Sequence, residues 1–485
     1  MTAAKAAMDL LVLGGTVVLP EGPRRVGIAI RDGKIAEIGP ERTLPDGRQR
    51  LDAAGAIVLP GAIDVHMHYD RDGRLTDRVG DATRSAAYGG ITSLVAFLLF
   101  EPGRRLVETV EDAIAELERD SYLDVGFHMY LRANDFDALA EIPVLVERGV
   151  SSFKMAMAYK RRGMMCSDEF LVAAMEAIAR SGGVAMVHAE SGETIDHLEQ
   201  RAIRAGRRAP TDYAATRPDY AEAEAVGRAA TFGRATGCAV YVVHLTSAAA
   251  LTRLVSMRAN GHDIQAETCP QYLALTDDAM RRFGNLAKVA PPLRTAADQE
   301  ALWRALEVGE IALVASDHAP YPSAKKQAAA DDVFASPFGA PTVETLLPVL
   351  HSEGVLRRDL GLSWLARVTS EAPARLFGLY PRKGAIRVGG DADLCVLDPR
   401  ASRTVTPGSL HSNADYTPFA GLELTGWPAV TVVAGDILIQ EGHLQGVTGR
   451  ARFLPREPLS GGLTERAPRL PQARQFMRNS YRVRR

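Results

Sequence analysis

The sequence carries two histidines two positions apart, His66 and His68, in the apolar segment AIDVHMH. Side chains of a β-strand alternate between its faces, so both imidazoles leave the same face and are able to bind one metal ion. Other apolar segments also end in metal-binding residues, namely His188, His244 and Asp317. A single histidine in a strand is usually a hydrogen-bonded core residue. Four histidines and an aspartate at the same level of one fold instead predict a metal centre.

Lys154 lies on a further segment of this kind, SSFKMAM. An ammonium group beside a metal ion would be repelled, and burial among cations lowers the pKa of a lysine. The neutral amine is able to add carbon dioxide and become a carbamate, an anionic ligand whose two oxygens bridge two ions. The alternative is a buried lysine paired with an acid. We favour the bridging ligand because the neighbouring strands supply the remaining ligands.

The segments that carry these residues repeat one pattern, an apolar strand followed by an amphipathic helix. One such helix is SDEFLVAAMEAIARSGG, with Ser167 as its expected N-cap and Gly182 at its end. The pattern occurs eight times, with strands expected at 62–68, 91–97, 124–131, 151–157, 184–190, 239–245, 263–269 and 311–318. Eight βα units predict a closed parallel (β/α)8 TIM-like barrel, in which functional groups lie at the C-terminal ends of the strands.

Short alternating strands with Gly-rich turns flank the barrel segment on both sides. The predicted fold class is therefore α/β, with a barrel over residues 59–383 and a small β-sandwich domain formed from both chain ends, residues 1–58 and 384–450. Residues 451–485 contain nine arginines and two glutamates. We expect this Arg-rich C-terminal tail to be solvated or loosely docked, with an arm that contacts another subunit as the alternative.

The composition excludes several classes of protein. The 485 residues are 46% hydrophobic and 24% charged, which is typical of a globular chain rather than a disordered or fibrous one. The net charge of −2 argues against nucleic-acid binding through a global positive field. The sequence has no uninterrupted run of about 18 apolar residues, so it predicts no membrane span. The four cysteines are scattered without a CxxC pair, so we expect neither disulfides nor a zinc ribbon, and a cytoplasmic location.

Six motifs, in order along the chain, resemble those of the amidohydrolase superfamily and, within it, the cyclic amidohydrolases: dihydropyrimidinase, hydantoinase, allantoinase and dihydroorotase. The resemblance covers about residues 8–455, and its motifs are LPGAIDVHMH, SFKMAMAYK, VHAES, VVHLTSAAAL, ETCPQYL and ASDHAPY. It implies a binuclear metal centre, usually of zinc. The implied ligands are His66, His68 and Asp317 for the first ion, His188 and His244 for the second, and N-carboxylated Lys154 as the bridge.

The resemblance also implies roles in catalysis. Asp317 would act as general base and acid, taking a proton from the attacking hydroxide and giving it to the departing ring nitrogen. The Tyr159 hydroxyl would donate a hydrogen bond to the developing oxyanion. The alternative is that Tyr159 is only an aromatic residue that lines the site. Backbone groups at Ala290 and near Pro341 would bind the cyclic amide; serine and asparagine are common there in the family, and proline offers no N–H.

Among the family members, the sequence favours hydantoinases and dihydropyrimidinases. Dihydroorotases typically have an arginine two residues beyond the second metal histidine, where this chain has Asp70. The expected reaction opens a hydantoin or dihydropyrimidine ring to the N-carbamoyl amino acid. Allantoinase, dihydroorotase and other cyclic imide hydrolases remain alternatives. A non-enzymatic scaffold related to dihydropyrimidinase is a remote alternative, because the chain retains all six ligands. The resemblance further implies a small-molecule substrate and a homotetramer, or a dimer.

The loop after the first barrel strand, RDGRLTDRVGD, is short and charged. Its Arg71 and Arg74, with Arg161 and Arg162 of the loop after Tyr159, are predicted to admit a polar or anionic substituent on the ring. The alternative is that these arginines are exposed on mobile loops and bind nothing.

Overall fold

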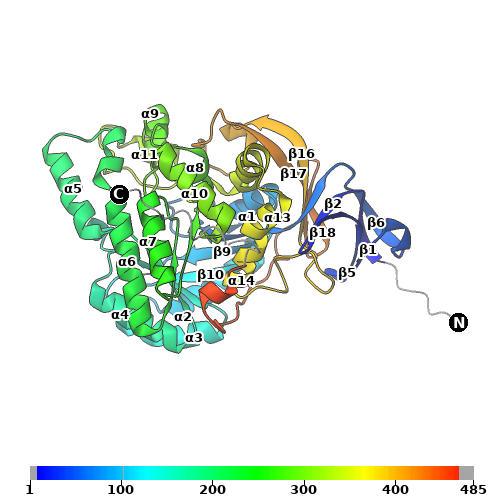
Figure 1. The fold of residues 1–485 in the computed structure, drawn as a ribbon, viewed down its shortest axis with the longest axis horizontal. Coiled ribbons are helices and arrows are strands. Elements are labelled where there is room, and N and C mark those ends of the chain that lie inside the picture. Colours follow the sequence, from blue (N-terminus) through cyan, green and yellow to red (C-terminus); the bar gives the residue numbers. More distant parts are fainter. Residues whose placement is uncertain (1–7, 102, 469–485) are drawn as a thin grey trace, which may run out of the picture.

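The computed structural model describes residues 8–101 and 103–468. It places a barrel ringed by helices beside a smaller all-β part that contains the first strands of the chain (Figure 1). Among the described residues, no helix has both the length and the apolar character needed to cross a membrane.

The barrel consists of eight parallel strands that neighbour one another in chain order. They are β8 (Ala62–Met67), β9 (Ile91–Leu98), β10 (Asp124–Tyr130), β11 (Ser152–Ala156), β12 (Val184–His188), β13 (Ala239–Val242), β14 (Ile264–Thr268) and β15 (Leu313–Val314). A parallel bridge between Met67 and His318 closes the ring, and the His68 amide donates to the His318 carbonyl at 2.8 Å. The predicted eight-stranded barrel is confirmed.

Helices surround these strands and turn their apolar faces toward them. In α4, Ser167 accepts a hydrogen bond from the Phe170 amide at 3.1 Å, as its N-cap position predicts. The helices are α1 (Val79–Tyr88), α2 (Leu106–Asp120), α3 (Ile142–Glu147), α4 (Asp168–Arg180), α5 (Gly192–Arg204), α6 (Asp219–Thr236), α7 (Ala248–Ala259), α8 (Pro270–Ala274), α9 (Ala279–Phe283), α10 (Ala296–Val308), α11 (Ser323–Gln327), α12 (Leu346–Val349), α13 (Leu362–Ala366), α14 (Ala372–Leu376) and α15 (Leu463–Arg466), with π-helical turns at Leu350–Leu356 and Arg367–Glu371.

Two further sheets form the β part. The first has the order β5-β4-β1-β6 and the second β19-β18-β17-β16-β7-β2-β3, so the second sheet joins both ends of the chain, as predicted. Val12, Val58 and Val432 belong to one buried cluster that these sheets share. The strands are β1 (Met8–Leu13), β2 (Thr16–Leu19), β3 (Gly22–Arg25), β4 (Gly27–Arg31), β5 (Lys34–Gly39), β6 (Gly47–Asp52), β7 (Ile57–Pro60), β16 (Leu394–Thr404), β17 (Glu423–Val433), β18 (Asp436–Gln440) and β19 (His443–Leu444).

The segment from Ala451 to Pro468 packs against the barrel. Leu454 and Leu463 are buried in the same apolar cluster as the barrel-strand residue Val65. The Arg456 side chain is 2% exposed, and its guanidinium donates to Ser152 Oγ at 2.8 Å. In these residues the segment is docked rather than solvated, because it covers apolar groups of the barrel that would otherwise face water. Residues 469–485 lie outside the described part of the chain.

Candidate metal centre

Three of the predicted metal-binding residues meet at the C-terminal end of the barrel. His66 Nε2 lies 3.0 Å from Asp317 Oδ1, and His68 Nε2 lies 3.7 Å from the same oxygen. One ligand atom from each residue lies within 4.8 Å of the other two. His66 lies on β8 and His68 directly follows its last residue, and Asp317 follows β15, the neighbour of β8 in the closed ring. Two nitrogens and one oxygen at this spacing suit a single divalent ion.

A second group lies beside the first. His188, the last residue of β12, has its Nδ1 3.0 Å from Nε2 of His244, which follows β13. The ring of His244 is 5.4 Å from that of His66, measured between centroids. The two groups therefore form neighbouring sets of donors, as expected for two ions held close together.

Lys154 projects from β11 into the same region. Its Nζ lies 5.3 Å from the centre of the Phe97 ring, which itself lies 4.6 Å from the His66 ring. Within the described ranges, no carboxylate comes within ion-pair distance of Lys154, so the structure does not support the alternative of a lysine paired with an acid. Burial lowers the pKa of Lys154 to about 7, although Glu267 and Asp317 oppose the shift. Much of the amine is thus neutral near pH 7, which is the form that reacts with carbon dioxide.

Two buried glutamates, which the sequence analysis missed, orient two of the histidines. Glu267 on β14 contacts His66 Nδ1, and Glu190 Oε2 lies 2.7 Å from His188 Nε2. Each acid occupies the ring nitrogen that faces away from the cluster, which leaves the other nitrogen free to bind a metal. The available signal was an acid at the end of an apolar strand, in the motifs VHAES and ETCPQYL.

The charges around His66 favour a cation. Burial lowers the pKa of His66, but Asp317 and Glu267 outweigh this effect and raise it to about 9. The same carboxylates that hold a proton on the ring would stabilise a metal ion in its place. The donor set thus fits a divalent metal ion on its own chemistry, because it offers imidazole nitrogens, a carboxylate, and buried carboxylates that contact the outer ring nitrogens.

Backbone strain accompanies the site. Tyr159, His244 and Asp317 have φ angles of 68°, 40° and 50°, in the left-handed region that non-glycine residues seldom adopt. Such residues cluster at functional sites, where surrounding contacts hold them against the strain. Each of these three residues follows the end of its strand and contacts a histidine of the cluster.

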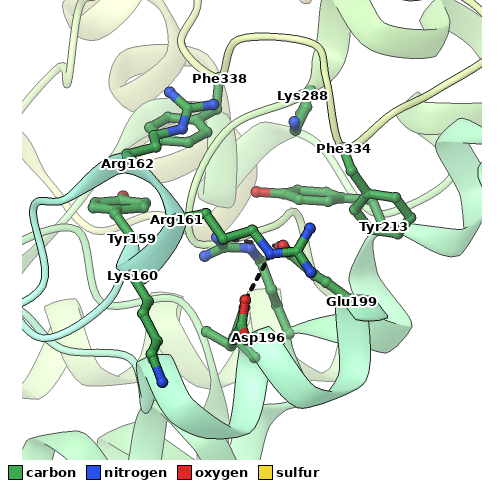
Figure 2. A pocket seen from close by; sticks show the side chains of 13 residues that line it. Tyr159, Lys160, Arg161, Arg162, Asp196, Glu199, Tyr213, Lys288, Phe334 and Phe338 are labelled. Atoms are coloured by element: carbon green, nitrogen blue, oxygen red, sulfur yellow. Dashed lines mark hydrogen bonds and ion pairs between the residues drawn. The ribbon is translucent and has the colours of Figure 1, made fainter. Parts of the chain in front are cut away.

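Tyr159 lies at the edge of the cluster. Its hydroxyl is 2.9 Å from His188 Nδ1. Its ring stacks on Phe338, with the centroids 4.9 Å apart (Figure 2). Burial raises the pKa of Tyr159 well above its usual value, so the hydroxyl keeps its proton. The side chain is therefore placed to donate a hydrogen bond to an oxygen held beside the histidines.

The cluster opens into a cavity of about 1030 Å³. Ala290 and Tyr159 line this cavity together with all six predicted metal-binding residues. Pro341 does not line it; that residue is buried, and the neighbouring Phe338 and Gly339 form the wall instead.

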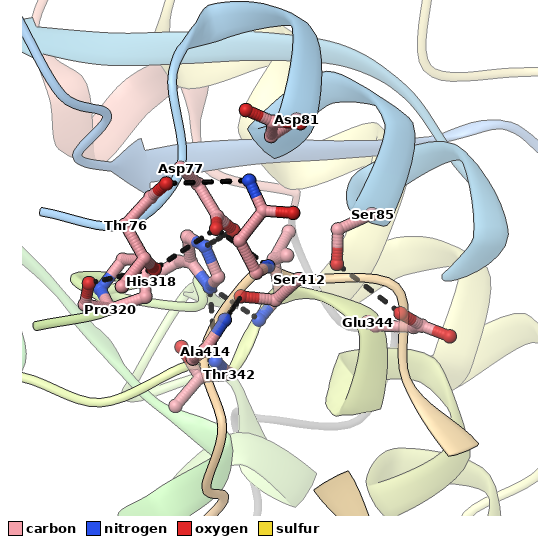
Figure 3. A network of polar contacts seen from close by, with 12 residues as sticks. Thr76, Asp77, Asp81, Ser85, His318, Pro320, Thr342, Glu344, Ser412 and Ala414 are labelled. Carbon is pink, nitrogen blue, oxygen red and sulfur yellow. Dashed lines mark hydrogen bonds and ion pairs between the residues drawn. The ribbon is translucent and has the colours of Figure 1, made fainter. Parts of the chain in front are cut away.

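A polar network holds the loops on either side of the cluster (Figure 3). His318 Nδ1 accepts from the Thr342 amide at 3.1 Å, so its Nε2–H donates to Asp77 Oδ2, 3.2 Å away. Asp77 also accepts from the Asn413 amide at 2.8 Å, which ties the loop after β8 to a segment that precedes β17. The network fixes His318, which directly follows Asp317 and whose carbonyl accepts from the His68 amide.

Comparisons with known proteins agree with this geometry. The family model described as "Amidohydrolase family" matches residues 57–438. A D-hydantoinase from Geobacillus stearothermophilus is 35% identical over 458 residues, which cover 93% of this chain and 97% of the relative. The crystal structure of a dihydropyrimidinase from Brevibacillus agri NCHU1002 matches with a TM-score of 0.90 at 33% identity, covering 94% of this chain and 100% of the other. An L-hydantoinase (dihydropyrimidinase) from Arthrobacter aurescens matches with a TM-score of 0.88 at 32% identity, covering 93% and 100%.

Proposed function

The chain belongs to the amidohydrolase family, and we propose that it hydrolyses a ring C–N bond of a cyclic amide or imide, opening a hydantoin or dihydropyrimidine to the N-carbamoyl amino acid. Its family and its barrel were both expected from the sequence, and both expectations are confirmed. The observation that carries the proposal is the position of Tyr159, whose hydroxyl lies 2.9 Å from His188 at the edge of two adjoining sets of metal donors.

We assign the ligands as the sequence predicts. His66, His68 and Asp317 would hold one ion, and His188 and His244 the other. Lys154, carboxylated on Nζ, would bridge them; its burial and lack of an acidic partner among the described residues support this role. We propose zinc, which imidazole and carboxylate ligands suit. When bound, such a pair of ions lowers the pKa of water to near 7 and polarises a carbonyl group.

The protein's own residues would supply the proton transfer and hold the substrate. The Asp317 carboxylate would take a proton from the attacking water and deliver it to the ring nitrogen that leaves. The Tyr159 hydroxyl would donate a hydrogen bond to the carbonyl oxygen as negative charge develops there. Ala290, which lines the cavity, would offer its backbone to the ring amide. A contact from Pro341 would require the wall at Phe338 and Gly339 to move, because Pro341 does not reach the cavity.

The same proposal includes the assembly and location of the protein. We propose a homotetramer, or a dimer, that works in the cytoplasm. The four cysteines are free and buried, which suits a reducing compartment.

The test is ring-opening activity of the zinc-loaded protein, produced with bicarbonate, on hydantoin, dihydrouracil, allantoin and dihydroorotate. We expect hydantoin or dihydrouracil to lose its ring absorbance and to yield an N-carbamoyl amino acid. The Tyr159→Phe variant should bind the same two equivalents of metal but turn over about 100-fold more slowly, since one oxyanion donor is worth about that factor. Metal-loaded protein that leaves all four rings closed would refute the proposal.

A further inference from the structure

The cavity extends well beyond the metal donors, which leaves room for a substituent on the ring. Its outer wall contains Arg71, Arg74, Arg104, Arg162 and Lys325. A cation that already forms an ion pair with an acid of the wall has little attraction left for a ligand. The cavity would therefore select acidic ligands only through cations that lack acidic partners.

Three of these cations are paired. Arg71 lies 3.0 Å from Glu116 and 3.3 Å from Glu101. Arg104 lies 2.7 Å from Asp112 and 2.9 Å from Glu101. Arg74 contacts Asp72. Arg71 and Arg74, which the sequence analysis predicted to face a substituent, are thus both held by carboxylates.

Arg162 differs from them. No carboxylate of the described residues lies within ion-pair distance of its guanidinium, which stands 4.1 Å from the centre of the Phe338 ring. Its neighbour Arg161 is 2.6 Å from Asp196; both arginines line a small adjoining cavity (Figure 2), but only Arg162 also lines the large one. A guanidinium that rests on an aromatic face keeps the N–H groups of its edge for other acceptors.

Lys325 of α11 is the second cation of the cavity without an acid at ion-pair distance among the described residues. Its Nζ lies 5.6 Å from the centre of the Tyr321 ring, and Tyr321 also lines the cavity. Burial raises the pKa of Tyr321, and Arg162 and Arg74 oppose this shift, so Arg162 also lies near Tyr321.

Arg162 is also tied to the residue that would bind the ring. The turn Lys160–Arg162 follows Tyr159 directly, and the Arg162 amide donates to the Tyr159 carbonyl at 2.9 Å. Both side chains contact Phe338, Tyr159 by stacking and Arg162 through its guanidinium. A ring held at the Tyr159 hydroxyl would thus have Arg162 beside its exposed edge.

We propose that Arg162 is a specificity-determining residue that binds an anionic group, a carboxylate in the simplest case, on the substituent of the substrate ring, and that Lys325 adds to the attraction at the mouth. This inference rests on the proposed ring-opening function and names its substrate class. Of the four arginines that the sequence analysis proposed for binding the substituent, only Arg162 remains, because Arg71, Arg74 and Arg161 already have acidic partners.

The test compares two substrates of nearly equal shape, 5-(2-carboxyethyl)hydantoin and its neutral amide, 5-(2-carbamoylethyl)hydantoin. We expect kcat/KM of the wild type to favour the acid by about tenfold or more, mainly through KM, and the preference to fall as salt is added. Arg162→Gln should remove most of the preference. Lys325→Gln should lower it by a smaller factor. Arg161→Gln is the matched control, and it should keep the preference.

Each outcome bears on the proposal. A wild-type ratio near one, or a ratio that Arg162→Gln leaves unchanged, would overturn it. Turnover of unsubstituted hydantoin reports the ring-opening function separately, so failure of that function is recognised on its own. If the metal-loaded protein leaves the rings closed, the affinities of the acid and the amide, measured by calorimetry, give the same comparison and decide the inference.

Discussion

Glu190 Oε2 lies 2.7 Å from Nε2 of His188, on the side of the ring opposite the cluster. The Nδ1 atom of the same ring faces His244 Nε2 at 3.0 Å. Glu190 also contacts Arg217, and Arg217 lies 3.7 Å from Glu199. The buried acid therefore fixes the tautomer in which Nδ1 carries the lone pair, and the arginine in turn compensates the buried charge of the acid.

Glu190→Gln should weaken metal binding more than it weakens the fold. The variant keeps the shape of the side chain but loses the charge that raises the basicity of His188, and outer partners of this kind contribute about 10- to 100-fold in metal affinity. Competition with a chelator, followed by metal analysis, measures the change. Glu199→Gln is the control, because Glu199 shares Arg217 but does not contact His188. Equal affinities for Glu190→Gln and the wild type would show that Glu190 does not orient the ligand.

Carboxylation of Lys154 should depend on pH. Burial lowers the pKa of Lys154 to about 7, so the amine is mostly protonated and unreactive below that pH and mostly neutral above it. At a fixed concentration of dissolved carbon dioxide, carbamate should form about tenfold faster at about pH 8 than at about pH 6. Carbon-13 NMR of metal-free protein in labelled bicarbonate measures the rate. Lys154→Met should give no carbamate signal, and a rate that does not change with pH would contradict the prediction.

The sequence predicts those features that follow from strand periodicity and strand order. His66 and His68 share a face because the period of a strand is two, and His188, His244 and Asp317 gather because parallel strands all end at one rim. The fold class follows from the same count of eight units.

Features that depend on contacts across the closed barrel are not visible in the pattern. Glu267 lies on β14 and His66 on β8, and these strands are not neighbours in the sheet, so no spacing in the sequence indicates their contact. The sequence does not distinguish Arg71 from Arg162, because the ion pair of Arg71 with Glu116 forms only in the fold. The assignment of Pro341 depended on the resemblance alone, and the structure puts Gly339 in the wall instead.

Asp77→Asn should destabilise the protein in a way that depends on pH. Burial alone would raise the pKa of Asp77, but His318 and the other hydrogen-bond partners outweigh burial and lower this pKa overall. A carboxyl whose pKa is lowered in the folded state adds stability above its unfolded pKa, near 3.9, and this contribution is lost as the pH falls toward the folded pKa. At neutral pH the variant should lose about 1–3 kcal/mol, because His318 Nε2–H is left facing an amide instead of a carboxylate.

Denaturant unfolding at neutral pH and near pH 3 measures this contribution. The difference between wild type and Asp77→Asn should shrink at the lower pH. Asp81→Asn is the control on α1; its carboxylate pairs with Arg84 at 3.1 Å near the surface and should contribute about 1 kcal/mol or less. A difference of constant size at both values of pH would indicate that the charge of Asp77 is not the stabilising feature.

Removal of residues 451–485 should lower the stability of the barrel, whereas a chain that ends at Pro468 keeps the described contacts of the segment. The longer truncation exposes the sites of Leu454 and Leu463, which are 2% and 0% exposed, and burial of the two leucines contributes about 3–6 kcal/mol. It also removes the Arg456 guanidinium from Ser152 on β11, the strand that carries Lys154. We expect an apparent Tm lower by about 5 °C or more for the chain that ends at Arg450 than for the chain that ends at Pro468. Equal melting temperatures would mean that the segment rests on the barrel without stabilising it.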